Sequence, residues 1–177
     1  GAMIYADGKR IYDHPIAKPD VTRIKNTIHR TGLGYCLEGG AGAYADHNGY
    51  ESLLWYFSGG SEDRELNIKK CMENGTYPEK FGSEENDSIY KICAYGTEWD
   101  PLYPQLEENL EQPYILTKVI ELKEDHFCIG EITDSRINKY TGVNTVLDYY
   151  NAEYFQAYGF GDSANDIPML KACGYGV

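Results

Sequence analysis

From residue 134 to its last residue the chain alternates helix and strand with short connections, and this pattern restricts the possible folds most strongly. We expect a helix capped by Thr141 and reaching Tyr150, because its apolar residues fall on one stripe. A strand at Phe155–Phe160, a helix at Ile167–Ala172 and the start of another strand at Tyr175–Val177 follow. Helix and strand in strict alternation are typical of a parallel, doubly wound sheet.

The first 133 residues follow another pattern, in which hairpins are separated by helices. Asp7-Gly8 is a tight-turn dipeptide between two short strands, Met3–Ala6 and Arg10–Tyr12. Pro19 suits a first helical turn, and Gly32 suits the end of the same helix. The remaining predictions are a hairpin of Gly34–Leu37 with Ala43–Asp46, an ambiguous apolar run at Glu51–Phe57, helices at Glu62–Asn74 and Leu102–Leu110, and strands at Ser88–Tyr95, Tyr114–Leu122 and His126–Ile132, the last two joined at Lys123–Asp125.

The sequence therefore predicts an α+β domain over residues 1–133, an antiparallel sheet with helices on one face. Residues 134–177 are predicted to form part of a parallel α/β core. We expect the first domain to fold by itself and the second to lack neighbouring strands on at least one edge.

The composition excludes several classes of partner. The net charge of −12 makes nucleic acid and anionic membrane surfaces unfavoured partners, since both are bound by clustered Lys and Arg. No apolar run approaches the roughly 20 residues of a membrane span. The five cysteines are odd in number and lack metal or redox spacing, which favours a reducing, cytoplasmic location. The sequence leaves the oligomeric state open.

The motif with the clearest chemistry is Gly159-Phe-Gly-Asp-Ser-Ala-Asn-Asp-Ile-Pro-Met-Leu170. The predicted strand runs into Asp162, at the sheet edge where α/β proteins bind ligands. A carboxylate there is a suitable oxygen ligand for Mg²⁺, and the helix start beside it favours anions. Alternatively, Asp166 is only an N-cap and Asp162 a solvated turn residue. Lys139 precedes the helix that leads into this strand, and its charge could reach a phosphoryl oxygen.

Lys139 with Gly142-Val143, and Gly161 through Leu170, resemble the third and fourth motifs of the haloacid dehalogenase superfamily, and more narrowly its Cof-type sugar-phosphate phosphatases. The resemblance implies the family's large cap joined to a Rossmann-like core. Residue matching implies that Asp162 holds Mg²⁺ and that Asp166 supports the metal site. It also implies that Asn165 contacts the phosphate and that Lys139 neutralises it. The family commonly has Gly after the Lys, where this chain has Tyr140.

The family's nucleophile motif, Asp-x-Asp-Gly-Thr, does not occur in these 177 residues. The resemblance therefore implies a cap plus part of a core, with the nucleophile outside this chain. We expect a Mg²⁺-dependent phosphatase of small phosphorylated metabolites, sugar phosphates being favoured, that works through an aspartyl-phosphate. The alternative is a non-catalytic phospholigand-binding module or an inactive fragment. An esterase with Ser163 as nucleophile is disfavoured, because no His follows Ser163.

Overall fold

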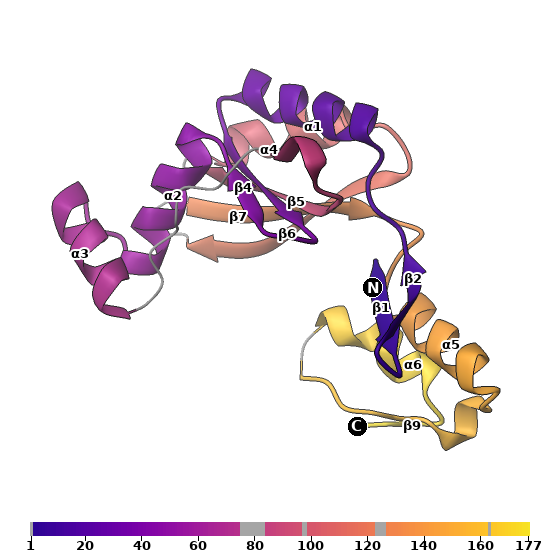
Figure 1. The fold of residues 1–177 in the computed structure, drawn as a ribbon. Helices are drawn as coiled ribbons and strands as arrows, with labels where there is room; N and C mark the ends of the chain where they lie inside the picture. Colours follow the sequence, from indigo (N-terminus) through magenta and orange to yellow (C-terminus); the bar gives the residue numbers. More distant parts are fainter. Residues whose placement is uncertain (1, 75–83, 97–98, 123–126, 163) are drawn as a thin grey trace. The chain divides into compact units, whose positions relative to one another are not determined.

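The structure is a computed structural model that describes residues 2–74, 84–96, 99–122, 127–162 and 164–177 (Figure 1). These residues divide into two units, one of residues 16–133 and the other of residues 1–15 with 134–177. The division corrects the predicted 1–133 domain, because the first fifteen residues group with 134–177. The reason is a tertiary contact, since the hydroxyls of Tyr149 and Tyr150 both donate to the carboxylate of Asp7 in the first hairpin.

The unit of residues 16–133 is built on a five-stranded sheet. The strand order is β4-β3-β5-β7-β6, and the pairs with a described register are antiparallel. This confirms the predicted α+β pattern of hairpins, while the turn predicted at Lys123–Asp125 lies outside the described residues. The strands are β3 (Gly34–Gly39), β4 (Ala43–Ala45), β5 (Ile89–Gly96), β6 (Tyr114–Leu122) and β7 (Phe127–Asp134).

Two helices, α1 (Lys18–Thr31) and α4 (Trp99–Glu108), lie side by side over one face of this sheet (Figure 1). Helix α1 begins with Pro19 in its first turn and ends at Gly32, whose φ of 78° only glycine adopts at low cost. Its apolar stripe packs on buried sheet residues such as Leu37 and Ile92, which forms the larger core. The amphipathic spacing of α1 was therefore a correct guide to its buried face.

The second face of the sheet is covered at one end by α2 (His47–Ser58), which is followed by α3 (Arg64–Asn74). This corrects the expectation that the helices lie on one face only. The second face carries Phe127 and Tyr95, and Trp55 of α2 packs on the Phe127 ring with 4.8 Å between ring centroids. Because these large apolar side chains need cover, the ambiguous run at Glu51–Phe57 folds as a helix.

The unit of residues 1–15 and 134–177 combines the first hairpin with the alternating segment. Strands β1 (Met3–Ala6) and β2 (Lys9–Asp13) pair antiparallel across Asp7 and Gly8, as predicted. Helix α5 (Lys139–Tyr150) begins two residues before Thr141. Asn138 is its N-cap and Thr141 the reciprocal partner in a capping box, so the predicted capping role of Thr141 is corrected.

Only two residues of the predicted strand Phe155–Phe160 form a strand, β8 (Tyr158–Gly159). Residues Tyr154–Gln156 form a 3₁₀ turn instead, in which Glu153 and Gln156 exchange side-chain to backbone hydrogen bonds. Strand β8 pairs in parallel with β9 (Tyr175–Gly176), which confirms the expected parallel pairing. The short helix α6 (Ile167–Ala172) connects the two strands.

Candidate functional site

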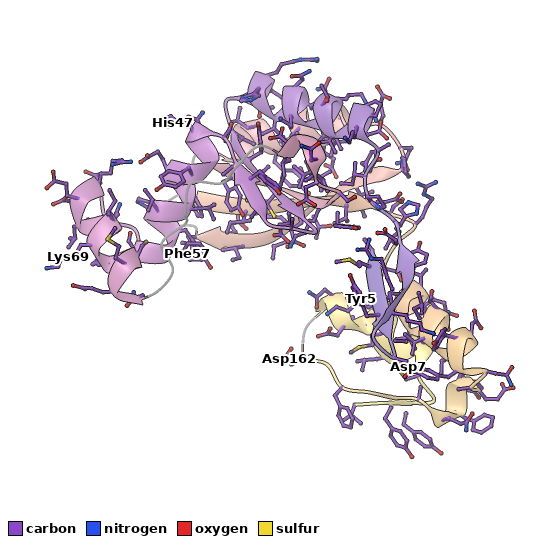
Figure 2. All side chains as sticks on the ribbon, in the orientation of Figure 1. Tyr5, Asp7, His47, Phe57, Lys69 and Asp162 are labelled. Carbon is purple, nitrogen blue, oxygen red and sulfur yellow. The ribbon has the colours of Figure 1, made fainter. Side chains whose placement is uncertain are left out.

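Asp162 lies in the loop that leads from β8 towards α6, and its side chain is exposed (Figure 2). The loop is anchored at the sheet, because the amide of Gly161 donates to the carbonyl of Val177 over 3.0 Å. Among the described residues, no cationic side chain forms an ion pair with the carboxylate of Asp162. The carboxylate is therefore accessible to a ligand from solvent. Ser163, the rejected esterase nucleophile, lies outside the described residues.

Asp166 is buried, with 7% of its surface exposed, at the entry to α6. The alternative interpretation of Asp166 as a simple N-cap is not supported, since its side chain makes no capping hydrogen bond. Its carboxylate accepts instead from the ammonium of Lys139. The burial of a charged carboxylate is costly unless it is paired, so the partner explains how Asp166 is tolerated there.

Lys139 is the first residue of α5, and Asn138 positions it through the capping box. Its Nζ atom also lies 3.4 Å from Oδ1 of Asn165, which is 26 positions away in the chain. The side chain of Lys139 remains 44% exposed, so solvent and small ligands reach its ammonium. The packing of α5 against α6 brings the two motifs together.

Gly161 allows this arrangement. A Cβ atom at this position would lie 2.4 Å from Cβ of Asp166, a distance that real side chains do not reach. The structure therefore brings Lys139, Asn165 and Asp166 into one cluster, with Gly161 making room for Asp166. It places Asp162 four residues ahead of Asp166 on the same loop, without a described contact to the cluster.

The described residues contain no group of three His, Cys, Asp or Glu side chains that could hold a metal ion. A Mg²⁺ ion does not require such a group, because it commonly takes one or two protein carboxylates and fills its shell with water and phosphate oxygens. The exposed carboxylate of Asp162 fits this requirement. Asp166 is held by Lys139, which suits it better to supporting the loop than to direct ligation.

Sequence reasoning missed a second charged cluster, at Asp134 and Arg136. The Arg136 guanidinium donates to both carboxylate oxygens of Asp134, and the His14 ring nitrogen lies 3.3 Å from one of them. The hydrogen bonds from Arg136 lower the pKa of Asp134 to about 2, against the opposing effect of burial. No periodicity or motif in the sequence pointed to this pair.

The sequence profile of the haloacid dehalogenase-like hydrolases matches residues 1–177. The chain belongs to this family. This confirms the resemblance carried by the two motifs, and the fold agrees with solved members. A haloacid dehalogenase-like hydrolase from B. subtilis superposes with a TM-score of 0.67 at 19% identity, over 99% of this chain and 65% of the other. A subclass IIB sugar phosphatase superposes with a TM-score of 0.65 at 14% identity, over 99% and 60%.

Among curated proteins, a phosphoglycolate phosphatase from Methanosarcina acetivorans is 27% identical to this chain over 117 residues. The match covers 59% of this chain and 50% of the archaeal protein. This chain thus spans about half to two thirds of the length of these relatives. In addition, none of the helices that the structure describes has the length and apolarity required to cross a membrane.

Proposed function

We propose that the protein containing this chain is a Mg²⁺-dependent phosphatase of small phosphorylated metabolites. The observation that carries the proposal is the ion pair between Lys139 and Asp166, which unites motifs 27 positions apart beside the exposed Asp162. Phosphoryl transfer uses such groups for positioning and charge neutralisation: a cation (Lys139), a buried carboxylate that holds it (Asp166) and a second carboxylate that is open to a ligand (Asp162).

Each side chain has a separate task in this proposal. The Lys139 ammonium donates to phosphoryl oxygens, and Asp166 keeps it aimed there by their ion pair. The amide of Asn165, 3.4 Å from the same ammonium, contacts the phosphate. Asp162 would hold Mg²⁺, which when bound neutralises phosphoryl oxygens as their charge redistributes. The family resemblance further implies an aspartyl-phosphate intermediate, for which we propose a carboxylate outside these 177 residues.

The proposal also covers the class of substrate and the cellular location of the protein. Family relatives include a phosphoglycolate phosphatase and a sugar phosphatase, so small phosphorylated acids and sugars are both reasonable classes. We favour sugar phosphates, on the resemblance of the motifs to Cof-type enzymes. All five cysteines are free, four of them buried, which suits the reducing conditions of the cytoplasm. A non-catalytic phospholigand-binding module is the second candidate, favoured by the absence of the nucleophile motif from this chain.

The test uses Asp162→Asn in the complete polypeptide that includes this chain. We expect Mg²⁺-dependent hydrolysis of hexose phosphates to fall by at least about 10²-fold, since a lost transition-state charge contact costs several kcal/mol. The fold should remain, because Asp162 is exposed. Asp148→Asn, which removes an exposed carboxylate from α5, is the matched control and should keep full activity. Normal turnover by Asp162→Asn would refute the metal role.

Lys139→Ala tests the phosphate role separately. We expect hydrolysis at saturating Mg²⁺ to slow by about 10²-fold or more, while Mg²⁺ binding measured by calorimetry changes little. An unchanged rate would show that Lys139 has no role in catalysis and is an ordinary surface lysine. If the parent protein binds phosphate esters but hydrolyses none with any divalent cation, the binding-module alternative is correct.

A further inference from the structure

Helix α1 and the chain that leads into β5 border a cavity of about 230 Å³ in the unit of residues 16–133. An apolar cavity of about 150 Å³ is enough to hold benzene, so this volume accommodates a small molecule. The candidate site around Lys139 and Asp162 lies in the other unit. The described residues that line the cavity are Ile16, Lys18, Val21, Thr22, Lys25, Glu84, Asp87 and Ile89.

The inner side of the cavity is aliphatic. Ile16, Val21 and Ile89 are buried members of the larger core, and each of them also lines the cavity. The amide of Ile16 donates to the carbonyl of Ile89 over 2.7 Å, which fixes the chain before α1 against the start of β5. A branched aliphatic group in the cavity would therefore leave water and pack on three aliphatic side chains.

The two walls of the cavity carry charged side chains. Lys18 and Lys25 come from one face of α1, while Glu84 and Asp87 come from the short 3₁₀ turn Glu84–Asn86 and the residue after it. Two ammonium groups and two carboxylates give the lining no net charge. Lys25 and Glu84 form an ion pair that connects the walls, and their side chains are 23% and 31% exposed. A dissolved ligand can therefore reach both groups.

The ion pair of Lys25 with Glu84 keeps capacity for a ligand. An ammonium has three N–H donors and a carboxylate has about four acceptor positions, and this pair uses one of each. The other described partner of the Lys25 ammonium is the Tyr35 side chain, whose ring centroid is 5.2 Å away. The hydrogen bond from Lys25 lowers the pKa of Glu84, so this carboxylate is charged at neutral pH.

Asp87 is bound more fully by the protein itself. The amides of Ala41 and Ser88 and the hydroxyl of Tyr44 donate to its carboxylate over 2.8–2.9 Å. Glu84 is therefore the carboxylate of the cavity that is better able to accept from a ligand. The negative charge of Asp87 still favours a cationic group in the cavity.

This arrangement matches a zwitterion with an aliphatic side chain. A ligand of a single charge would match only one half of the ion pair, and the uncharged lining as a whole gives it no net attraction. A structural ion pair alone explains the contact between the two walls. It does not explain the unfilled volume beside them, since well-packed proteins leave few voids larger than a water molecule.

We propose that this cavity binds the zwitterion of a small aliphatic α-amino acid. Lys25 donates to the carboxylate of the ligand, and Glu84 accepts from its ammonium. The aliphatic side chain of the ligand packs on Ile16, Val21 and Ile89. The inference goes beyond the proposed phosphatase activity and does not depend on it.

The test titrates L-leucine into the isotopically labelled 177-residue chain and follows its backbone amide resonances. We expect saturable shifts in the first half of α1 and at the start of β5. Isocaproate lacks the ammonium and isoamylamine lacks the carboxylate, so each should bind about tenfold more weakly, the effect of one lost charge-assisted hydrogen bond. Glycine lacks the aliphatic side chain and should also bind at least about tenfold more weakly.

Two variants locate the binding site. Glu84→Gln keeps the shape of the side chain and should weaken leucine binding by about tenfold. Glu51→Gln is the matched control and should leave it unchanged, because Glu51 is also 31% exposed and forms an ion pair with Arg64. Neither Glu51 nor Arg64 is among the described lining residues of the cavity.

Absence of saturable shifts with leucine would overturn the inference. Equal affinities of leucine and any one of the three truncated ligands would also overturn it, because the missing group would then make no contact. Equal leucine binding by Glu84→Gln and Glu51→Gln would place the ligand elsewhere and refute the assignment. Should Glu84→Gln lose its native spectrum, the three truncated ligands still decide the question on the parent chain.

Discussion

The contact between Gly161 and Asp166 makes Gly161→Ala the most informative single substitution in the candidate site. The added Cβ would meet Cβ, Cγ and Oδ2 of Asp166 at 2.4, 2.9 and 3.1 Å. These atoms belong to the first bonds of a buried side chain and cannot simply rotate away. The φ angle of Gly161 lies outside the left-handed region, so alanine can adopt this backbone conformation. Any loss of stability in the variant therefore comes from the contact of the new Cβ with Asp166.

The expected destabilisation follows from three contributions. Overpacking a filled site costs about 1–3 kcal/mol. Displacement of Asp166 weakens its ion pair with the half-exposed Lys139, and this destabilises the fold by at most about 1 kcal/mol more, which is the value of an exposed ion pair. The lower chain entropy of alanine in the unfolded state offsets about 0.4–1 kcal/mol. The midpoints of these ranges give a net cost of about 2 kcal/mol, which corresponds to an about 30-fold higher population of the locally open state.

Hydrogen exchange of the amides in α6 and β9 measures this opening directly. The control is Gly42→Ala, where the nearest atom to the new Cβ is the Tyr44 hydroxyl at 3.9 Å. We expect exchange to accelerate in α6 and β9 of Gly161→Ala and to stay unchanged there in the control. Exchange rates that match the parent chain within about twofold would refute the packing argument.

Two further predictions concern stability. Asp134 has a pKa lowered to about 2, so the native state binds fewer protons than the unfolded state, and its stabilisation is present above pH 4 and lost as the pH falls towards 2. Arg136 is largely exposed, and solvent screening therefore reduces the free energy of this ion pair. We expect Asp134→Asn to lower the unfolding free energy by about 1–2 kcal/mol at pH 6 and to have no effect near pH 2. Urea titrations of both chains at the two pH values check this, and a difference that is the same at both would contradict it. Ile92→Ala removes a side chain with no exposed surface from the larger core, and should cost about 2–5 kcal/mol in urea unfolding followed by tryptophan fluorescence, whereas a cost below about 1 kcal/mol would mean that the core collapses around the void.

The sequence by itself determined the elements whose signals are local. The Asp7-Gly8 turn, the first turn of α1 with Pro19 and the C-cap of α1 at Gly32 all depend on backbone preferences of the residues present. The strand and the helix on either side of Asp162 were also predicted, although the strand is limited to Tyr158–Gly159. Such features need no partner from a distant part of the chain.

Only the tertiary structure decided which distant segments meet. The ion pair of Lys139 with Asp166, the grouping of residues 1–15 with 134–177, and the ion pair of Lys25 with Glu84 all join residues far apart in the chain. The helical state of α2 likewise depends on the aromatic sheet face that it covers. The physical reason is that local preferences act over a few residues, whereas pairing and burial are set by the free energy of the whole fold.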